Sequence, residues 1–389
     1  MKHQDSSNKV LFLATVPSMI ISFNLRNIQM LQSMGYEVHA ACNFKDRSAW
    51  TQEQLDSFKD IFSQHSVVMH QVDFPRKPYH PILLRRSYCQ IKKLLKKENY
   101  AMMHNQSCVS GILGRVACRK LDTKIIHTEH GFYYFKGCPA INWIYYPFDK
   151  LCSQWTEAFV TINKDDFRFA QTHMKAKSYW YIPGVGVDTS RFRNTVIDRA
   201  AMRKTWHIPS EATVILSVGE LNSNKNHIVI IDAISKMNIS DVYYIVCGTG
   251  VEREHLLLQA KVCGLEERVI LTGNVDNVNE FCKMSDIFAF PSKREGLGLA
   301  AIEAMASGLP LVASNKNGIN DYAEDGKTGF LCDPTDVDAF AESLKRLIDD
   351  SQLRRKMGEY NTEKAKEFDN IKADEIMLNM YHEVMQNDH

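Results

Sequence analysis

The sequence predicts an α/β protein made of two parallel-sheet domains, and three observations lead to that fold class. At 389 residues the chain is longer than one ordinary hydrophobic core accommodates. Short apolar runs alternate with helical patterns from end to end, which is typical of parallel sheets covered by helices. The alternation pauses once, at the turn-rich segment 183–188 and the polar stretch that follows. We therefore expect one domain over residues 1–188 and a second from residue 189.

Each domain repeats the same alternation of strand and helix. The predicted strands of the first domain are 10–15, 37–42, 66–72, 100–104, 124–127, 158–162 and 179–182, and its predicted helices are 22–34, 81–97 and 107–121. The predicted strands of the second are 213–218, 242–247, 269–272, 287–290 and 311–313. Its predicted helices are 227–236, 251–262, 278–284, 299–306, 336–349 and 352–366, and a last helix covers 373–385. Such sheets bind ligands at the carboxyl ends of their strands, so we expect a site in the cleft between the domains.

Composition and charge restrict the classes of protein to which the chain can belong. No apolar run has the length of a membrane span, and the N-terminal residues lack the apolar core of a signal peptide. Ten cysteines form no C-x-x-C pair, which favours reduced thiols in a cytoplasmic protein. Residues 1–188 carry 24 lysines and arginines against 15 aspartates and glutamates, a net charge of +9, and residues 189–389 carry −8. The basic half is compatible with nucleic acid, an anionic bilayer or a diphosphate-bearing substrate.

The glycine turn after the apolar run 287–290 carries the strongest functional signal. A polar turn with Glu295 leads into Gly296-Leu-Gly298, which opens the helix 299–306. A strand that turns through glycines into a helix directs free N–H groups and the positive end of the helix dipole at one point, which favours an anion. Glu295 and Glu303 flank that point, and because carboxylates repel phosphate we expect them to accept hydrogen bonds from hydroxyl groups. This combination suits a nucleotide-sugar.

The same turn also fits the dinucleotide fingerprint G-x-G-x-x-A, from Gly296 to Ala301, with Asp321 about twenty residues farther on. An NAD-dependent oxidoreductase is therefore an alternative. The fingerprint belongs directly after the first strand of its domain, whereas this turn follows a late strand and is separated from it by residues 291–295. The position favours the nucleotide-sugar interpretation.

Two other strands of the second domain end in glycine turns. The strand 213–218 is followed by Gly219, and Lys225 opens the next helix, where an ammonium group can neutralise a pyrophosphate. An exposed lysine without a function gives the same pattern. The strand 242–247 ends in Gly248-Thr-Gly250, which fits either a close approach of backbone to a nucleotide or a plain tight turn.

Histidines follow one strand of the first domain. His127 and His130 flank Glu129, but H-x-x-H is one residue short of the zinc motif H-E-x-x-H and no third ligand stands out. We favour His130 as a polar group lining the cleft, and we expect no metal there. Asp336-Val-Asp338 has a spacing that can hold a metal–diphosphate, but its position at a helix start favours an N-cap.

The first domain also has a basic helix and an aromatic segment. Apolar and basic residues lie on separate faces of the helix 81–97, and the basic ones are Arg85, Arg86, Lys92, Lys93, Lys96 and Lys97. A core-packed helix with a solvated face and a helix docked on an anionic membrane both fit this pattern. The segment 132–155 is dense in aromatic residues, which suits a headgroup-level surface, an acceptor groove or a core.

These motifs resemble those of the retaining glycosyltransferases of family 4, whose GT-B fold consists of two Rossmann-like domains facing across a cleft. The resemblance covers nearly the whole chain, and its most specific part is PSKREGLGLAAIEAMASGLPLVAS (291–314) with the spacing E-x7-E. The segment from Gly219 to Lys225, GNVDNV (273–278) and IPGVGVD (182–188) support it. TEHGFYYFKG and VTINKDD are similar to the subgroup that builds capsule and exopolysaccharide repeat units.

The resemblance implies roles for the donor-site residues. Glu303 would hold the ribose hydroxyls, and Glu295 would hold hydroxyls of the donor sugar. Backbone N–H groups near Gly298 and Leu299, together with Lys225, would stabilise the departing diphosphate. Donor contacts would also come from Gly219 and from the backbone around Asn274 and Val275, which would meet the base.

The resemblance also implies how the rest of the chain takes part. His130 would lie near the transferred sugar and the acceptor. Family members need no metal or other cofactor. Residues 189–369 would form the donor-nucleotide domain, residues 1–188 the acceptor domain, and the helix 370–389 would cross back to the first domain.

Two positions depart from the family pattern. Glu220 stands where many relatives carry arginine, so the paired Arg–Lys phosphate clamp is reduced to Lys225, and Arg294 is the candidate for compensation. The first strand-to-helix turn, 15–22, lacks the family's usual glycine pair, which bears on the acceptor contacts.

We therefore predict a retaining hexosyl- or N-acetylhexosaminyltransferase that uses a nucleotide diphosphate sugar, with UDP as the first candidate. Its acceptor would be a saccharide or a polyprenyl-diphosphate-linked saccharide of bacterial surface polysaccharide synthesis. It would act in the cytoplasm, with an anionic membrane surface as a partner of the N-terminal domain and without nucleic acid. A non-catalytic nucleotide-sugar-binding protein and the oxidoreductase remain the alternatives.

Overall fold

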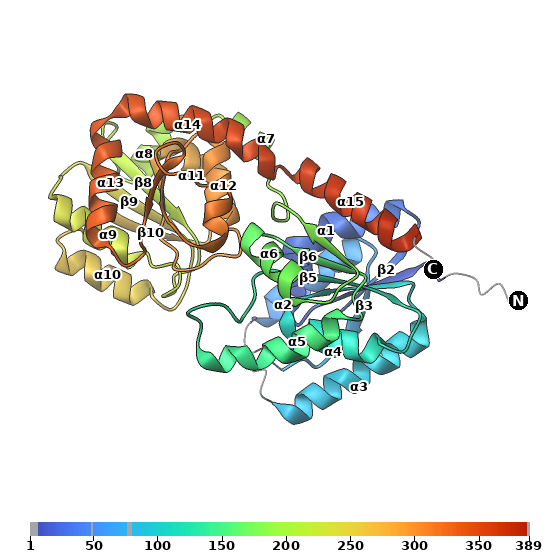
Figure 1. The fold of residues 1–389 in the computed structure, drawn as a ribbon. Coiled ribbons are helices and arrows are strands. Elements are labelled where there is room, and N and C mark those ends of the chain that lie inside the picture. The colour runs from blue at the N-terminus through green and yellow to red at the C-terminus, as the bar shows by residue number, and fades with distance from the viewer. Residues whose placement is uncertain (1–6, 48–49, 76–79, 387–389) are drawn as a thin grey trace, which may run out of the picture. The chain divides into compact units, whose positions relative to one another are not determined.

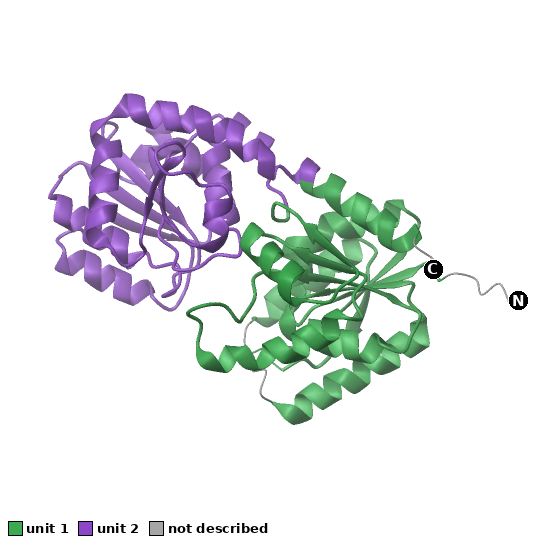
Figure 2. Cartoon of the chain, in the orientation of Figure 1, with its two compact units in different colours: residues 1–185, 373–389 green, residues 186–372 purple. Residues whose placement is uncertain are grey.

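The computed structural model describes residues 7–47, 50–75 and 80–386, and within them the chain forms two compact units. Residues 1–185 and 373–389 belong to the first unit, and residues 186–372 form the second (Figure 2). Each unit contains one parallel sheet with helices packed around it (Figure 1). The α/β class with two parallel sheets, predicted from the sequence, is confirmed.

The first unit is built on a seven-stranded sheet in the order β3-β2-β1-β4-β5-β6-β7. Its strands are β1 (Lys9–Leu13), β2 (Glu37–Cys42), β3 (Val68–Gln71), β4 (Met102–Gln106), β5 (Lys124–Glu129), β6 (Ala158–Thr161) and β7 (Ser178–Tyr181). Its helices are α1 (Pro17–Ser33), α2 (Gln52–Gln64), α3 (Pro81–Glu98), α4 (Cys108–Cys118), the 3-10 helix η1 (Ala140–Ile144), α5 (Tyr145–Ser153) and α6 (Lys164–His173). The central strand β4 is buried along its whole length.

The second unit is built on a six-stranded sheet in the order β10-β9-β8-β11-β12-β13. Its strands are β8 (Thr213–Val218), β9 (Val242–Cys247), β10 (Val269–Gly273), β11 (Ile287–Phe290), β12 (Leu311–Ser314) and β13 (Gly329–Cys332). Its helices are α7 (Thr189–Asn194), α8 (Arg199–Thr205), α9 (Ile228–Met237), α10 (Arg253–Val262), α11 (Val278–Met284), α12 (Leu299–Ala306), η2 (Asn317–Asp321), α13 (Val337–Asp349), α14 (Ser351–Ala365) and η3 (Lys366–Phe368).

The structure adds elements that the apolar pattern did not predict, among them α2, α6 and the edge strand β13. The two helices bury few apolar side chains, but their first turns are capped by polar residues. Thr51 and Gln54 form a capping box at α2, and Asn163 accepts a hydrogen bond from the Asp166 N–H at α6. The N-cap predicted for the D-x-D segment is confirmed, because Asp336 accepts a hydrogen bond from the Ala339 N–H at α13.

The last helix, α15 (Asn370–Gln386), belongs to the first unit from Ala373 onward. Its Tyr381 is fully buried, and the hydroxyl group lies 2.9 Å from Nδ1 of His104 on β4. Near its start, Asp374 pairs with the guanidinium group of Arg26 on α1. These contacts attach the helix to α1 and β4 of the first unit. Among the described residues, no helix has the length and apolar character of a membrane span.

We expect Tyr381→Phe to lower the free energy of unfolding by about 1–3 kcal/mol, because it leaves a buried ring nitrogen of His104 without its partner. Chemical denaturation of the full chain measures the effect. Tyr360→Phe is a suitable control, because the Tyr360 hydroxyl bonds to Glu324 at an exposed position. Equal stability of the Tyr381 variant and the wild type would contradict the anchoring role of this contact.

Candidate active site

The strand order of the second unit reverses between β8 and β11, and this reversal assembles the site. The connections after the two strands leave the sheet in opposite directions, which opens a crevice at its carboxyl edge. Lys225 follows β8 and Glu295 follows β11. Lys225 Nζ lies 2.6 Å from Glu295 Oε1, although 70 residues separate the two in the chain. The sequence pointed to each residue separately, and the fold brings them into contact.

Gly298 is the N-cap of α12, and no side chain caps the backbone N–H groups at this end of the helix. Its φ of +92° is a left-handed conformation that favours glycine, and an added Cβ would lie 2.6 Å from the Phe290 ring. The first N–H groups of a helix, here around Leu299, have no acceptor within the helix. Lys225 Nζ lies 5.3 Å from the centroid of the same Phe290 ring. The ammonium group is therefore beside the glycine turn.

Backbone hydrogen bonds tie the loops of this edge to one another. The Lys293 N–H donates to the Asn224 carbonyl oxygen at 2.8 Å, and the Asn224 side-chain amide donates to the Arg294 carbonyl oxygen at 2.9 Å. Gly318 approaches so closely that an added Cβ would lie 2.1 Å from the Gly296 carbonyl oxygen. The turn that carries Arg294 and Glu295 is thus fixed from both sides.

The glycine segments after β8 and β9 pair with each other. The Gly219 N–H donates to the Cys247 carbonyl oxygen, and the Leu221 N–H donates to the Thr249 carbonyl oxygen, each at 2.9 Å. The turn after β9 therefore has a structural function in shaping the Lys225 loop. Glu220 is exposed, and its carboxylate accepts a hydrogen bond from Asn222 at 3.0 Å.

Glu303 lies on α12, farther along the helix that Gly298 caps. The side chain is partly buried, and this burial raises the pKa of its carboxyl group, whereas the charge of Arg191 acts in the opposite direction. Arg191, on α7, also donates to the Asp276 carbonyl oxygen at 3.2 Å. That carbonyl follows Asn274 and Val275 in the loop between β10 and α11, where Thr249 bonds to the Asn274 side chain at 3.3 Å. Arg191 thus connects the predicted ribose and base positions.

His130 lies in the first unit, directly after β5. Its Nε2 is 2.7 Å from Oε1 of Gln106 at the end of β4, and its ring packs against Phe23 of α1 with centroids 4.7 Å apart. Burial lowers the pKa of His130 to about 4. The ring is therefore neutral at pH 7.

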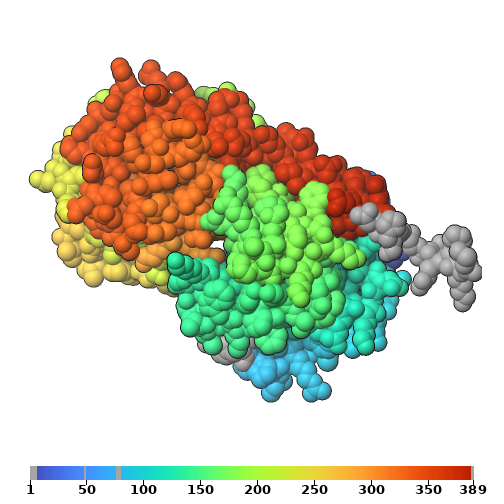
Figure 3. Space-filling model, in the orientation of Figure 1, coloured from blue at the N-terminus to red at the C-terminus, as the bar shows by residue number. Residues whose placement is uncertain are grey.

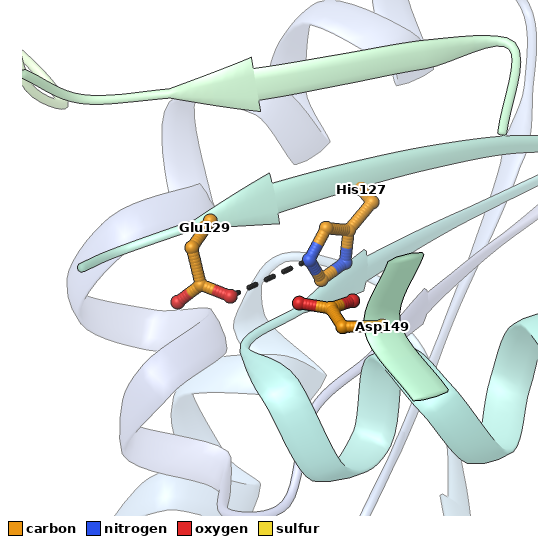
Figure 4. Close-up of side chains that lie close together, drawn as sticks. All are labelled: His127, Glu129 and Asp149. Atoms are coloured by element: carbon orange, nitrogen blue, oxygen red, sulfur yellow. Dashed lines mark ion pairs between the residues drawn. The ribbon is translucent and has the colours of Figure 1, made fainter. Parts of the chain in front are cut away.

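His127, Glu129 and Asp149 form a buried cluster (Figure 4). His127 Nδ1 contacts Asn105, and its Nε2 lies 3.5 Å from Glu129 Oε2. Burial holds the pKa of His127 well below its usual range. The oxygens of Asp149 are occupied by Arg115 and by the Tyr134 hydroxyl group. This donor set does not fit a metal ion, because the Asp149 carboxylate already neutralises the buried guanidinium group of Arg115. His130 does not belong to the cluster, since its Nε2 faces Gln106.

A pocket of about 450 Å³ lies at the carboxyl ends of β1 to β5 in the first unit. Trp50, Phe74, Tyr133 and Tyr145 line it together with Asp46 and the residues Thr15 and Val16 of the first strand-to-helix turn. The turn that lacks the glycine pair therefore contributes side chains to the pocket wall. The composition of the wall suits a sugar, whose C–H faces pack on aromatic rings and whose hydroxyl groups donate to carboxylates.

The basic helix and the aromatic segment divide between core and surface. On α3 the side chains of Ile91 and Leu95 are buried, and the lysines of the opposite face are exposed. Phe132 and Tyr134 belong to the core, but η1 and α5 expose apolar side chains, with Ile141 70%, Phe148 55% and Leu151 55% exposed. The segment is part of the molecular surface in Figure 3, where it is coloured teal to green.

Sequence reasoning missed Gln106 and Arg191. The predicted strand ended at His104, although β4 continues as His104-Asn105-Gln106 with every residue buried. Polar residues at the end of a central strand are a signal that was available, because a buried amide needs a partner. Arg191 lies in a charged stretch after the linker, and nothing in its local pattern distinguishes it.

Comparison with known proteins shows which families match this chain. The family of glycosyl transferases group 1 matches residues 198–364, and the glycosyl transferase 4-like family matches residues 9–163. EpsD of Bacillus subtilis (strain 168), named as a glycosyltransferase, is 30% identical over 98% of this chain and 98% of its own. An Escherichia coli UDP-Gal:alpha-D-GlcNAc-diphosphoundecaprenol alpha-1,3-galactosyltransferase is 26% identical, with 91% of each chain covered.

Among solved structures, Alr3699/HepE of Anabaena in complex with UDP superimposes with a TM-score of 0.77 at 18% identity, covering 96% of this chain and 100% of its own. That likeness concerns the fold, and it agrees with the two parallel sheets described above. The dinucleotide alternative is wrong, because the glycine turn follows β11 rather than the first strand of its sheet and the family matches are to glycosyltransferases. The chain is a GT-B glycosyltransferase and belongs to the family of glycosyl transferases group 1.

Proposed function

We propose that the enzyme transfers a sugar from a UDP-sugar, with retention of anomeric configuration, to a saccharide or polyprenyl-diphosphate-linked acceptor. The observation that carries this proposal is the contact between Lys225 and Glu295 beside the α12 N-terminus, with Glu303 on the same helix. UDP in the Anabaena protein and the named donor and acceptor of the E. coli relative support it. A role in surface polysaccharide synthesis follows from such an acceptor.

In the proposed reaction the bond between the anomeric carbon and the diphosphate oxygen breaks, and the acceptor oxygen bonds to the same face of that carbon. The diphosphate gains negative charge as it leaves. Lys225 and the backbone N–H groups around Gly298 and Leu299 stabilise that charge more than the ground state, which is where the rate gain arises. The leaving phosphate oxygen takes the proton of the acceptor hydroxyl, so the mechanism needs no protein base.

The carboxylates act on hydroxyl groups in this mechanism. Glu303 accepts hydrogen bonds from the ribose, and Glu295 accepts them from the donor sugar while it holds Lys225. The backbone at Asn274 and Val275 contacts the base. His130 and the pocket with Trp50 and Tyr133 bind the transferred sugar and the acceptor. No metal ion or other cofactor takes part.

We expect Lys225→Ala to lower kcat by about 100- to 1000-fold, because it removes a cation that stabilises the leaving diphosphate. Release of UDP with a candidate acceptor, and its absence without one, measures turnover and separates an enzyme from a nucleotide-sugar sensor. Lys261→Ala is the control, because Lys261 is an exposed lysine of α10. Wild-type turnover in the Lys225 variant would exclude the cationic role.

We expect Glu303→Ala to weaken UDP binding about 10- to 100-fold, since a hydrogen bond to a charged group contributes about 1.5–3 kcal/mol. Isothermal titration with UDP measures the change. Glu303→Gln keeps one acceptor oxygen without the charge. Its affinity for UDP should therefore lie between those of the wild type and Glu303→Ala. Unchanged affinity in both variants would argue against the ribose role.

An anionic membrane surface is the second part of the proposal, with the enzyme at the cytoplasmic face. The exposed lysines of α3 offer charge, and the exposed side chains of η1 and α5 offer apolar contact. Both features belong to the same unit as the acceptor pocket. A basic face combined with exposed apolar groups favours attachment to anionic lipid.

We expect the protein to float with anionic liposomes at low salt, and Lys92→Glu with Lys96→Glu to reduce flotation at least tenfold, because each basic residue contributes about 1 kcal/mol. Phe148→Ser with Leu151→Ser should weaken binding by removing apolar contact. Leu258→Ser is the control, since Leu258 is 61% exposed in the second unit. Absence of wild-type flotation at low salt would refute membrane docking.

A further inference from the structure

The hydrogen bond between His130 and Gln106 bears on which ring nitrogen of His130 carries the proton. His130 Nε2 lies 2.7 Å from Gln106 Oε1, and the hydrogen bond has a direction that depends on which ring nitrogen carries the proton. An amide oxygen only accepts. With this oxygen facing the ring, Nε2 must be the protonated nitrogen.

The orientation of the Gln106 side-chain amide is determined by the partner of its nitrogen atom. Gln106 Nε2 donates to Asn24 Oδ1 at 3.3 Å, and the same oxygen accepts a hydrogen bond from Asn27 Nδ2 at 3.0 Å. Gln106 and Asn24 are buried, so water does not compete for these groups. Because Asn24 Oδ1 attracts the amide nitrogen of Gln106, the amide oxygen is left to face His130.

A neutral imidazole with its proton on Nε2 has its lone pair on Nδ1. No described residue makes a hydrogen bond to Nδ1 of His130, whereas Nε2 is occupied by Gln106 and the ring packs on Phe23. Burial keeps the ring neutral, with a pKa of about 4. The group that His130 presents to a ligand is therefore an acceptor nitrogen.

We propose that Gln106 is a positioning residue that holds His130 in the Nε2-protonated tautomer, so that Nδ1 accepts a hydrogen bond from a substrate hydroxyl group. This inference rests on the proposed function, in which His130 contacts the transferred sugar or the acceptor. The ligand class at Nδ1 is a hydroxyl donor, and a carboxylate or phosphate oxygen is excluded because two acceptors repel.

His127, on β5, does not share this arrangement. Its Nδ1 contacts Oδ1 of Asn105, the residue before Gln106 on β4, and its Nε2 lies 3.5 Å from Glu129 Oε2. Both ring nitrogens of His127 therefore face oxygen atoms, and the geometry selects a single tautomer for His130 alone of these two rings.

The experiment is two-bond proton–nitrogen correlation NMR of the full chain labelled with nitrogen-15 histidine, at neutral pH and without substrate. Loss of one set of signals in His130→Asn and of another in His127→Asn assigns the two rings. We expect the Nε2-protonated pattern for His130. An Nδ1-protonated His130 in the wild type overturns the proposal.

Two variants separate tautomer control from general packing. Gln106→Met removes the acceptor oxygen and should convert His130 to a mixture of tautomers. Ser110→Ala is the matched control, because the Ser110 hydroxyl donates to the backbone carbonyl oxygen of Gln106 rather than to its side chain. An unchanged His130 pattern in Gln106→Met overturns the proposal.

Turnover tests the second half of the inference. Gln106→Met should lower kcat by up to about a hundredfold, through misplacement of the substrate hydroxyl group, with unchanged UDP affinity. Ser110→Ala should keep the wild-type kcat and KM. A changed tautomer with wild-type kcat and KM refutes the hydroxyl contact. Failure of the wild type to release UDP with any acceptor would refute the proposed function but leave the tautomer measurement valid.

Discussion

The strand order of each sheet reverses once, and the candidate site depends on that reversal. It falls between β1 and β4 in the first unit and between β8 and β11 in the second. Connections that leave a sheet in opposite directions cannot fill the space above the carboxyl edge between them, so ligands bind there. In the second unit this edge carries the Lys225–Glu295 contact. In the first it carries the aromatic pocket, whose wall includes Thr15 after β1 and Cys108 after β4.

The two units fix their functional groups by different physical means. In the second, backbone hydrogen bonds between loops hold the glycine turn, as between Asn224 and Lys293. In the first, side chains buried within the sheet do so: His104 bonds to Thr128 at 2.7 Å, and Gln106 bonds to His130. A buried polar network is rigid when its members are satisfied, because every alternative arrangement loses hydrogen bonds in a medium of low dielectric. The histidine is therefore positioned by the core rather than by a loop.

The sequence predicted what is encoded locally. The glycine turn, Glu295, Glu303 and Lys225 stand in short patterns with a direct physical meaning, and twelve strands were visible as apolar runs. The contact between Lys225 and Glu295 depends on the strand order, which no local pattern contains. Gln106 was missed because polar residues were taken to end a strand, whereas β4 buries three of them in succession. β13 was missed because its four residues begin with a glycine that strand patterns disfavour.

Two carboxylates, Glu220 and Glu295, determine the charge balance around Lys225. Glu220 places an exposed carboxylate in the loop after β8, and Lys225 is already paired with Glu295. In the proposed site a diphosphate would share the Lys225 ammonium group with the Glu295 carboxylate. The N–H groups at Gly298 and Leu299 have no such competitor, because the helix cap makes no side-chain hydrogen bond. We infer that in the proposed reaction the α12 N-terminus carries a large share of the leaving group's charge. Since backbone dipoles are fixed by the fold, that share requires no reorganisation during the reaction.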